Sequence, residues 1–259
     1  MIAGGLFCHV AGPADAPAVV LLHALATHGE LWRPQWPAWS MAFRLIAIDL
    51  PGHGMSPAPT APMTLADYAD QVAAALDALG IQRAAVVGLS LGGMVAQAFA
   101  LRQPGRVRSL VLAHTTARTL PAVRVIWDER LAQFEREGLE KQVEPTLGRW
   151  FAPAFAGASP LTMAWVARQI RATSSAGYTS AISAIRALDH FDRLGEISMP
   201  ALVVAGDADA AIPLQAASAL TERLPRAERF VLKDAGHLGN VQQPVAFTEA
   251  VGNFLMRTH

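Results

Sequence analysis

The stretch Gly88-Leu89-Ser90-Leu91-Gly92-Gly93 lies between a short β-branched, apolar run at residues 84–87 and a long apolar run at residues 94–101. The first run is typical of a strand and the second of a helix, which places Ser90 at a strand-to-helix turn. So tight a turn strains the backbone of its tip residue and leaves no room for side chains at positions 88 and 92. The pattern predicts a nucleophile elbow, whose following helix points its positive end at the reacting centre.

Two alternatives compete with this interpretation. Gly-x-Ser-x-Gly is a short pattern, and many glycine-flanked serines belong to ordinary turns. Residues 84–101 also form an 18-residue stretch without a charge, which reaches the length of a membrane-spanning helix. However, Ser90, Gln97 and three glycines interrupt that stretch, so a strand, a turn and a helix explain it better.

The composition indicates one large globular domain, or one domain that carries an insertion. Of the 259 residues, 52% are hydrophobic, which is enough for a sizeable core. The 21 basic and 21 acidic residues give no net charge and form no basic stripe, so we expect neither nucleic acid nor an anionic membrane as a partner. Cys8 is the only cysteine, which excludes an intramolecular disulfide. With no visible signal peptide, we expect a cytoplasmic protein.

Short apolar runs alternate with helical patterns along most of the chain. Apolar runs without alternation suit the strands of a parallel sheet that is covered on both faces. The strand candidates are residues 19–22, 45–48, 84–87, 110–113, 202–205 and 229–232, and the helix candidates include residues 64–79, 213–224 and 244–256. Thr64 and Asp67 form a variant of the capping box at the start of the first of these helices. The order predicts an α/β fold with a mostly parallel, doubly wound sheet.

Residues 118–190 break this rhythm. They contain no good strand candidate, while Trp127, Leu131 and Phe134 fall at helical spacing. We expect residues 118–190 to form a helical cap over the carboxyl edge of the sheet, and residues 1–117 and 191–259 to form the core. Most of the aromatic residues in the cap are expected to pack it onto the core.

A serine hydroxyl needs a neighbouring base, and the base needs a carboxylate that orients it. The candidate base is His237, which follows the last predicted strand and precedes the last predicted helix. Asp209 is the favoured acid, because its loop follows the strand at residues 202–205 and leaves room to turn toward the histidine. Asp207 follows the strand so closely that it could cap a turn instead. Asp234 is a third possibility, but it lies very near His237 in the sequence.

Further residues complete the expected site. The oxyanion of a tetrahedral intermediate needs backbone donors, and we assign them to Leu91, directly after the nucleophile, and to Leu25, in the loop after the strand at residues 19–22. His114 and Trp150 are candidates for the substrate pocket, although either could simply pack in the core. The remaining histidines have no setting that distinguishes a base from a structural residue. No metal-ligand spacing and no phosphate-binding glycine loop is found, so we expect no metal and no cofactor.

Together these residues resemble the α/β-hydrolase superfamily over essentially the whole chain. The resemblance is carried by five segments, at residues 23–25 (His-Ala-Leu), 49–56 (Asp-Leu-Pro-Gly-His-Gly-Met-Ser), 88–92, 206–209 and 235–237 (Ala-Gly-His). Within that superfamily the chain is most similar to 3-oxoadipate enol-lactonases and related carboxylesterases. The segments that indicate this are residues 149–155 (Arg-Trp-Phe-Ala-Pro-Ala-Phe), 177–178, 184–189 and 237–244.

The chain departs from those lactonases at several positions. Such lactonases usually carry Ser-Leu-Gly where this chain has Ala-Leu-Ala at residues 24–26, and an arginine in place of Pro51. They usually also carry a glutamate in place of Gln242. The resemblance therefore implies the serine, acid and histidine roles, but not an acidic substrate. A cationic partner for such a substrate would come from the cap, where Arg118, Arg124, Arg149 and Arg186 are candidates, each of which could instead be a solvated surface charge.

The first functional hypothesis is a hydrolase that cleaves a small carboxylic ester or lactone through an acyl-enzyme, as a monomer or homodimer. Ser90 would be the nucleophile, His237 the base and Asp209 the acid that orients it. A cofactor-free perhydrolase or lyase is an alternative, because similar triads support both reactions. A receptor of the same fold that turns its ligand over slowly is the alternative from another functional class. Epoxide hydrolases and haloalkane dehalogenases of this fold carry an aspartate at the elbow, so the serine argues against both.

Overall fold

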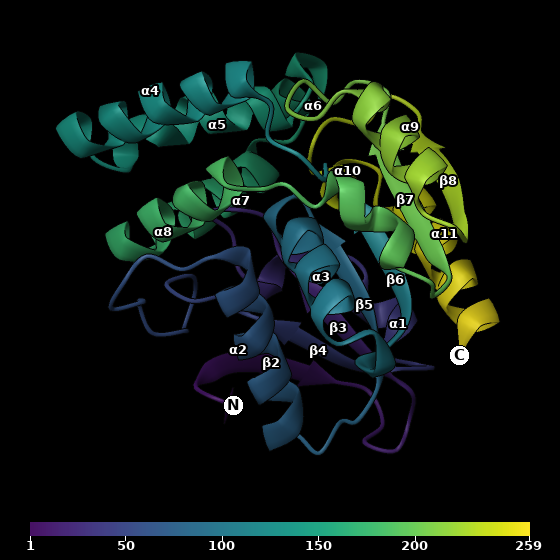
Figure 1. Cartoon of the computed structure of the whole chain (residues 1–259). Coiled ribbons are helices and arrows are strands. Elements are labelled where there is room, and N and C mark those ends of the chain that lie inside the picture. The colour runs from purple at the N-terminus through teal and green to yellow at the C-terminus, as the bar shows by residue number, and fades with distance from the viewer.

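A mostly parallel sheet of eight strands forms the centre of the molecule (Figure 1). The computed structural model describes all 259 residues. From one edge of the sheet to the other, the strands are β1 (Ile2–Ala3), β2 (Leu6–Ala11), β4 (Arg44–Ile48), β3 (Ala18–Leu22), β5 (Ala84–Leu89), β6 (Val107–Ala113), β7 (Ala201–Gly206) and β8 (Ala227–Leu232). Only the pairs β1–β2 and β2–β4 are antiparallel. The predicted α/β class is therefore confirmed.

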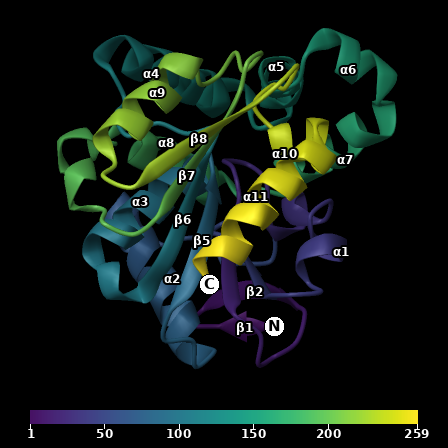
Figure 2. The same cartoon turned by 90° about the vertical axis from the view of Figure 1, so that its right-hand side faces the viewer.

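Helices cover both faces of the sheet, as Figure 2 shows from the side. The covering helices are α2 (Leu65–Ala78), α3 (Leu91–Arg102) and α9 (Leu214–Arg223) on one face, and α1 (Trp36–Trp39) and α11 (Pro244–Thr258) on the other. A short helix, α10 (Gly239–Gln242), precedes α11. Every residue of β5 is buried, and so are four of the five residues of β3. Burial on both faces explains why these strands are continuous apolar runs.

The helix α2 begins at the predicted capping box. The side chain of Thr64 accepts a hydrogen bond from the backbone N–H of Asp67, and the carboxylate of Asp67 accepts one from the backbone N–H of Thr64 at 2.7 Å. These two bonds satisfy N–H groups that have no partner inside the helix. The carboxylate accepts bonds from both the backbone N–H and the hydroxyl group of Thr64, and these hold the pKa of Asp67 below its usual value.

Five helices lie between β6 and β7. They are α4 (Pro121–Glu137), α5 (Glu140–Trp150), α6 (Pro153–Ala158), α7 (Pro160–Arg171) and α8 (Ser175–Arg186), and we call them the cap. Figure 1 shows them together on one side of the sheet. The loop after β4 meets the cap where the backbone N–H of Ser174 donates to the carbonyl oxygen of Gly52 at 2.9 Å. As expected, residues 118–190 contain no strand; their only β-type pairing is a single bridge between Arg118 and Asp189.

The charge-free stretch at residues 84–101 is β5, a turn and all of α3 except its last residue. None of the helices combines the length and the apolar character that are needed to cross a membrane. The local reason for the break is Ser90, which has φ 55° and ψ −114° and so can continue neither a strand nor a helix.

Backbone atoms pack closely around this turn. A Cβ atom added to Gly88 would lie 2.3 Å from the carbonyl oxygen of Gly92, and one added to Gly92 would lie 2.1 Å from that of Leu22. The second contact brings the first turn of α3 against the end of β3. Both glycines are therefore required by close approach, as the sequence pattern predicts.

The loop after β3 is tied to the end of β4 by His23. Its Nδ1 atom lies 2.7 Å from the carbonyl oxygen of Ala24, and its Nε2 atom accepts a hydrogen bond from the backbone N–H of Leu50 at 2.9 Å. The ring therefore carries its proton on Nδ1 and is neutral. Burial, together with the nearby His53, lowers the pKa of His23 to about 3.

We expect the substitution Gly92→Ala to destabilise the protein by about 3 kcal/mol, because the added methyl group would overlap a carbonyl oxygen. Urea unfolding at pH 7 would measure the loss. The matched control is Gly148→Ala in α5, where nothing lies within 4 Å of the added atom and alanine should stabilise the helix by about 0.5–1 kcal/mol. Equal stabilities of the two variants would contradict the packing described for the turn.

Stability should decrease as the pH falls below about 6.5, the usual pKa of histidine in an unfolded chain. Because the folded pKa of His23 is lowered to about 3, the unfolded chain binds a proton between these values that the native protein does not bind. Above pH 6.5 this penalty is absent. In the variant His23→Gln, the slope of unfolding free energy against pH should decrease by up to about 1.4 kcal/mol per pH unit between pH 4 and 6. Parallel curves for the two proteins would contradict this assignment.

Candidate active site

Ser90 stands at the tip of the turn between β5 and α3, with a half-buried side chain. Its backbone N–H donates to the carbonyl oxygen of Ala113 at 2.9 Å, and its own carbonyl oxygen accepts a bond from Thr115 Oγ1 at 2.8 Å. Its positive φ of 55° is a strained conformation of the kind that collects at functional sites. The end of β6 thus fixes the backbone that presents the hydroxyl group.

His237 lies next to this hydroxyl group. Its Nε2 atom is 2.9 Å from Ser90 Oγ, a hydrogen-bonding distance across 147 residues of sequence. The backbone N–H of His237 donates to the carbonyl oxygen of Trp150 at 2.8 Å, so the end of α5 holds the histidine loop after β8. The ring is almost completely buried.

Asp209, in the loop after β7, contacts the other side of the His237 ring. His237 Nδ1 is 3.0 Å from Asp209 Oδ2 and 3.2 Å from Asp209 Oδ1. The side chain of Asp209 is buried, whereas the other two candidate acids, Asp207 and Asp234, are exposed. Of the three aspartates considered from the sequence, Asp209 alone is hydrogen-bonded to the histidine.

The carboxylate of Asp209 has several further donors. The backbone N–H groups of Ala211 and Ile212 donate to Oδ1 at 2.8 and 2.9 Å, and His114 Nδ1 lies 3.0 Å from Oδ2. Burial opposes ionisation of Asp209, but the neighbouring His237 and the hydrogen bonds from both histidines hold its pKa well below the usual range. The site therefore contains a fixed negative charge at neutral pH.

The expected oxyanion donors lie on two loops in direct contact. The backbone N–H of Gly92 donates to the carbonyl oxygen of His23 at 3.0 Å, which joins the loop after β3 to the start of α3. Leu91 is the first residue of α3, so its N–H has no acceptor within the helix. Leu25 lies in the adjoining loop and is buried. Both residues thus belong to backbone segments that adjoin Ser90.

The two expected pocket residues have different positions. The ring of Trp150 is buried and its centroid lies 6.2 Å from that of His237, at an angle of 31°. His114 is also buried, but its ring contacts Asp209. Its ring therefore lies against the acid and has no exposed surface. The sequence carries no signal of the contact, which joins residues 95 positions apart.

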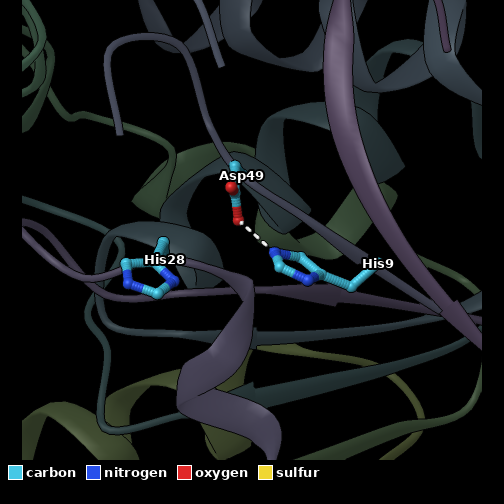
Figure 3. Close-up of side chains that lie close together, drawn as sticks. All are labelled: His9, His28 and Asp49. Carbon is cyan, nitrogen blue, oxygen red and sulfur yellow. Dashed lines mark hydrogen bonds and ion pairs between the residues drawn. The ribbon is translucent and has the colours of Figure 1, made fainter. Parts of the chain in front are cut away.

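Figure 3 shows a second cluster of polar side chains, formed by His9 in β2, His28 in the loop after β3 and Asp49 directly after β4. The possible metal ligands His9, His28 and Asp49 offer atoms within 4.8 Å of one another, as do the three buried residues His114, Asp209 and His237. Asp49 already accepts bonds from His9 Nε2 at 3.1 Å, from Gly29 N at 2.7 Å and from Met55 N at 2.8 Å. Burial opposes ionisation, but these bonds lower the pKa of Asp49 to about 2. We interpret the cluster as a tie between the loops after β3 and β4.

Comparison with known proteins agrees with this geometry. The chain matches the family model of the α/β-hydrolase fold over residues 17–244. The 3-oxoadipate enol-lactonase 2 of Acinetobacter baylyi is 31% identical over 246 residues, which cover 95% of this chain and 91% of the lactonase. The crystal structure of the enol-lactonase from Burkholderia xenovorans LB400 has a TM-score of 0.93 and 33% identity, and the match covers 97% of this chain and 96% of that one.

A hydrolase from Pseudomonas aeruginosa PA01 gives a similar match, with a TM-score of 0.92 and 35% identity over 96% of this chain and 94% of its own. The family model spans most of the sequence, and the solved structures cover nearly all of the fold. The resemblance predicted from the sequence motifs is confirmed, and the chain belongs to the α/β-hydrolase family.

Proposed function

We propose that this protein is a serine hydrolase that cleaves a carboxylic ester or a lactone through an acyl-enzyme. The observation that carries the proposal is a continuous chain of contacts, from Ser90 Oγ to His237 Nε2 at 2.9 Å and from His237 Nδ1 to Asp209 Oδ2 at 3.0 Å. This order of nucleophile, base and orienting acid is what acyl transfer requires. The relatives named as enol-lactonases support the choice of an ester-like substrate.

In the first half of the reaction, Ser90 Oγ attacks the carbonyl carbon of the substrate. A new O–C bond forms while the hydroxyl proton passes to His237 Nε2. The ionised Asp209 stabilises the imidazolium that results, because its Oδ2 atom already accepts the Nδ1 proton. When the tetrahedral intermediate collapses, the C–O bond to the leaving oxygen breaks, and that oxygen takes the proton from Nε2. In a lactone the leaving oxygen stays attached to the acyl group.

In the second half, water attacks the acyl carbon and His237 accepts a proton from it. The bond between Ser90 Oγ and the acyl carbon then breaks, and the proton returns to the serine. In both halves the negative oxygen would be held by the backbone N–H groups of Leu91 and Leu25. Each such donor is typically worth about 3 kcal/mol of the barrier.

The cap arginines suggest that the substrate carries an acid group. Arg118 pairs with Asp189 at 2.7 Å, and Arg186 pairs with Asp128. Arg124 donates to a backbone carbonyl oxygen. Arg149, like Arg124, has no carboxylate within 4.0 Å, and its only side-chain bond goes to the hydroxyl group of Thr146. An unpaired guanidinium group in the cap can therefore hold a carboxylate of the substrate.

A second arginine reinforces this position. Arg130 Nη2 donates to Thr146 Oγ1 at 2.7 Å, and Arg149 Nη2 lies 3.3 Å from the same oxygen. Arg130 Nε donates to the hydroxyl group of the buried Tyr178 at 2.7 Å. Neither arginine has a carboxylate partner, and burial together with the charge of Arg130 lowers the pKa of Arg149. Two guanidinium groups without an anion favour a bidentate acid ligand.

Replacing the nucleophile tests the proposed chemistry. The substitution Ser90→Ala should lower kcat for a chromogenic short-chain ester by about four to six orders of magnitude, because no acyl-enzyme can form. The matched control is Ser218→Ala on α9, which should hydrolyse the ester like the wild type. If Ser90→Ala retained a tenth of the activity, the proposed mechanism would be wrong. The wild type should also show steady turnover, since a burst of one product per protein followed by no turnover would indicate a receptor instead.

The arginines predict a preference among substrates. In Arg149→Gln, the ratio of kcat/KM for an ester with a distal carboxylate to that for its neutral methyl ester should fall about tenfold, the effect of losing 1.4 kcal/mol of selective binding. The control Arg136→Gln removes another exposed arginine of the same cap, from α4, and should leave the ratio unchanged. An unchanged ratio in both variants would show that Arg149 does not contact an acid group of the substrate.

A further inference from the structure

A second imidazole is hydrogen-bonded to the acid of the site. His114 follows β6 directly, and its Nδ1 atom lies 3.0 Å from Asp209 Oδ2. The same oxygen lies 3.0 Å from Nδ1 of His237. The two rings are steeply inclined, at 79°, with their centroids 6.0 Å apart. One carboxylate oxygen therefore serves two histidines that lie far apart in the sequence.

The positions of the protons follow from the contacts. An ionised carboxylate can only accept hydrogen bonds, so both Nδ1 atoms carry a proton that points at Asp209. Burial lowers the pKa of His114, so this ring is neutral and its Nε2 atom is unprotonated. That atom has no hydrogen-bond partner and packs against Gly239, where an added Cβ would lie 2.4 Å from it. His114 can donate to the acid, but it has no route by which to relay a proton.

The two oxygens of Asp209 are held in different ways. Oδ1 accepts bonds from the backbone N–H groups of Ala211 and Ile212, in addition to the 3.2 Å contact with His237 Nδ1. Oδ2 has only the two imidazoles as donors. Because His237 must take up and release protons at its other nitrogen during catalysis, His114 is the one donor to Oδ2 that does not take part in the reaction. Its hydrogen bond restrains Oδ2, while the backbone N–H groups of Ala211 and Ile212 restrain Oδ1.

The backbone at His114 is shaped for this contact. Its φ of 49° is left-handed, a conformation that histidine and asparagine tolerate better than most residues. The backbone N–H still pairs with the carbonyl oxygen of Val204 in β7 at 2.8 Å, so the strain begins only after the strand has ended. The next residue, Thr115, donates its hydroxyl proton to the carbonyl oxygen of Ser90. Adjacent residues thus support the nucleophile and the acid.

We propose that His114 is a positioning residue of the hydrolysis, and that its Nδ1–H bond holds Asp209 Oδ2 in place for His237. The inference rests on the proposed function, since it assigns a role within that reaction. It predicts that kcat depends on a hydrogen-bond donor at position 114, whereas KM does not, because the side chain of His114 is completely buried against the acid.

Two substitutions separate the donor from the ring. His114→Asn keeps an N–H donor on the atom that follows Cγ and tolerates the left-handed backbone. His114→Gly also tolerates that backbone but has no donor. We expect His114→Gly to lower kcat about 10- to 100-fold, a change typical of a lost supporting contact, and to change KM by less than about twofold. His114→Asn should stay within about threefold of the wild type in both constants.

The control is His190→Gly, which removes a half-buried imidazole outside the site and should leave kcat unchanged. If His114→Gly folds and keeps the wild-type kcat, or if His114→Asn loses as much activity as His114→Gly, the inference is overturned. If the wild type shows no hydrolysis that depends on Ser90, the proposed function fails instead.

A measurement on the wild-type protein keeps the inference testable should His114→Gly not fold. Nitrogen-15 NMR of labelled histidine should show His114 protonated at Nδ1 and unprotonated at Nε2 at pH 7. The opposite tautomer would exclude the donor role.

Discussion

Close contact between backbone atoms at the turn after β5 is the constraint on which the rest of the site depends. The first turn of α3 lies directly against the carbonyl oxygen of Leu22, and position 88 lies against the backbone at position 92. Because these contacts involve main-chain atoms, no rearrangement of side chains could relieve them. The turn therefore holds Ser90 in one strained conformation and joins the ends of β3, β5 and β6 at a single point. The hydroxyl group is positioned by the sheet rather than by its own loop.

The buried charge of Asp209 is the second requirement. A carboxylate out of water is tolerated only when donors surround it, and here two backbone N–H groups and two imidazoles do so. The donors come from the loops after three strands, β6, β7 and β8. Formation of the site is thus coupled to formation of that side of the sheet. The same arrangement keeps the acid ionised, which is the state that can stabilise an imidazolium.

The sequence predicts the central strands well because they are buried on both faces and therefore consist of continuous apolar runs. The β1–β2 ribbon, which we did not predict, is short, lies at the sheet edge and has partly exposed residues, so its pattern is weak. Ser90, Asp209 and His237 could be predicted because each follows a recognisable strand. The contact between His114 and Asp209 could not be predicted, because it depends on the left-handed backbone of His114 and on how two loops approach each other. The pairing of the cap arginines is also tertiary, because Arg130, Thr146 and Tyr178 lie on three different helices.

The departures from the lactonase pattern have unequal structural consequences. Ala26 stands where those lactonases usually carry glycine, and its φ of 57° is the conformation that glycine adopts freely. The loop therefore keeps its shape at a cost of about 1 kcal/mol, and the backbone N–H of Leu25, the proposed oxyanion donor next to it, need not move. Pro51 stands where those lactonases usually carry an arginine. It is buried and uncharged, so this position supplies no cation to the site. Under the proposed function, an acid group of the substrate would be held from the cap, where Arg130 and Arg149 both contact Thr146 and have no carboxylate partner.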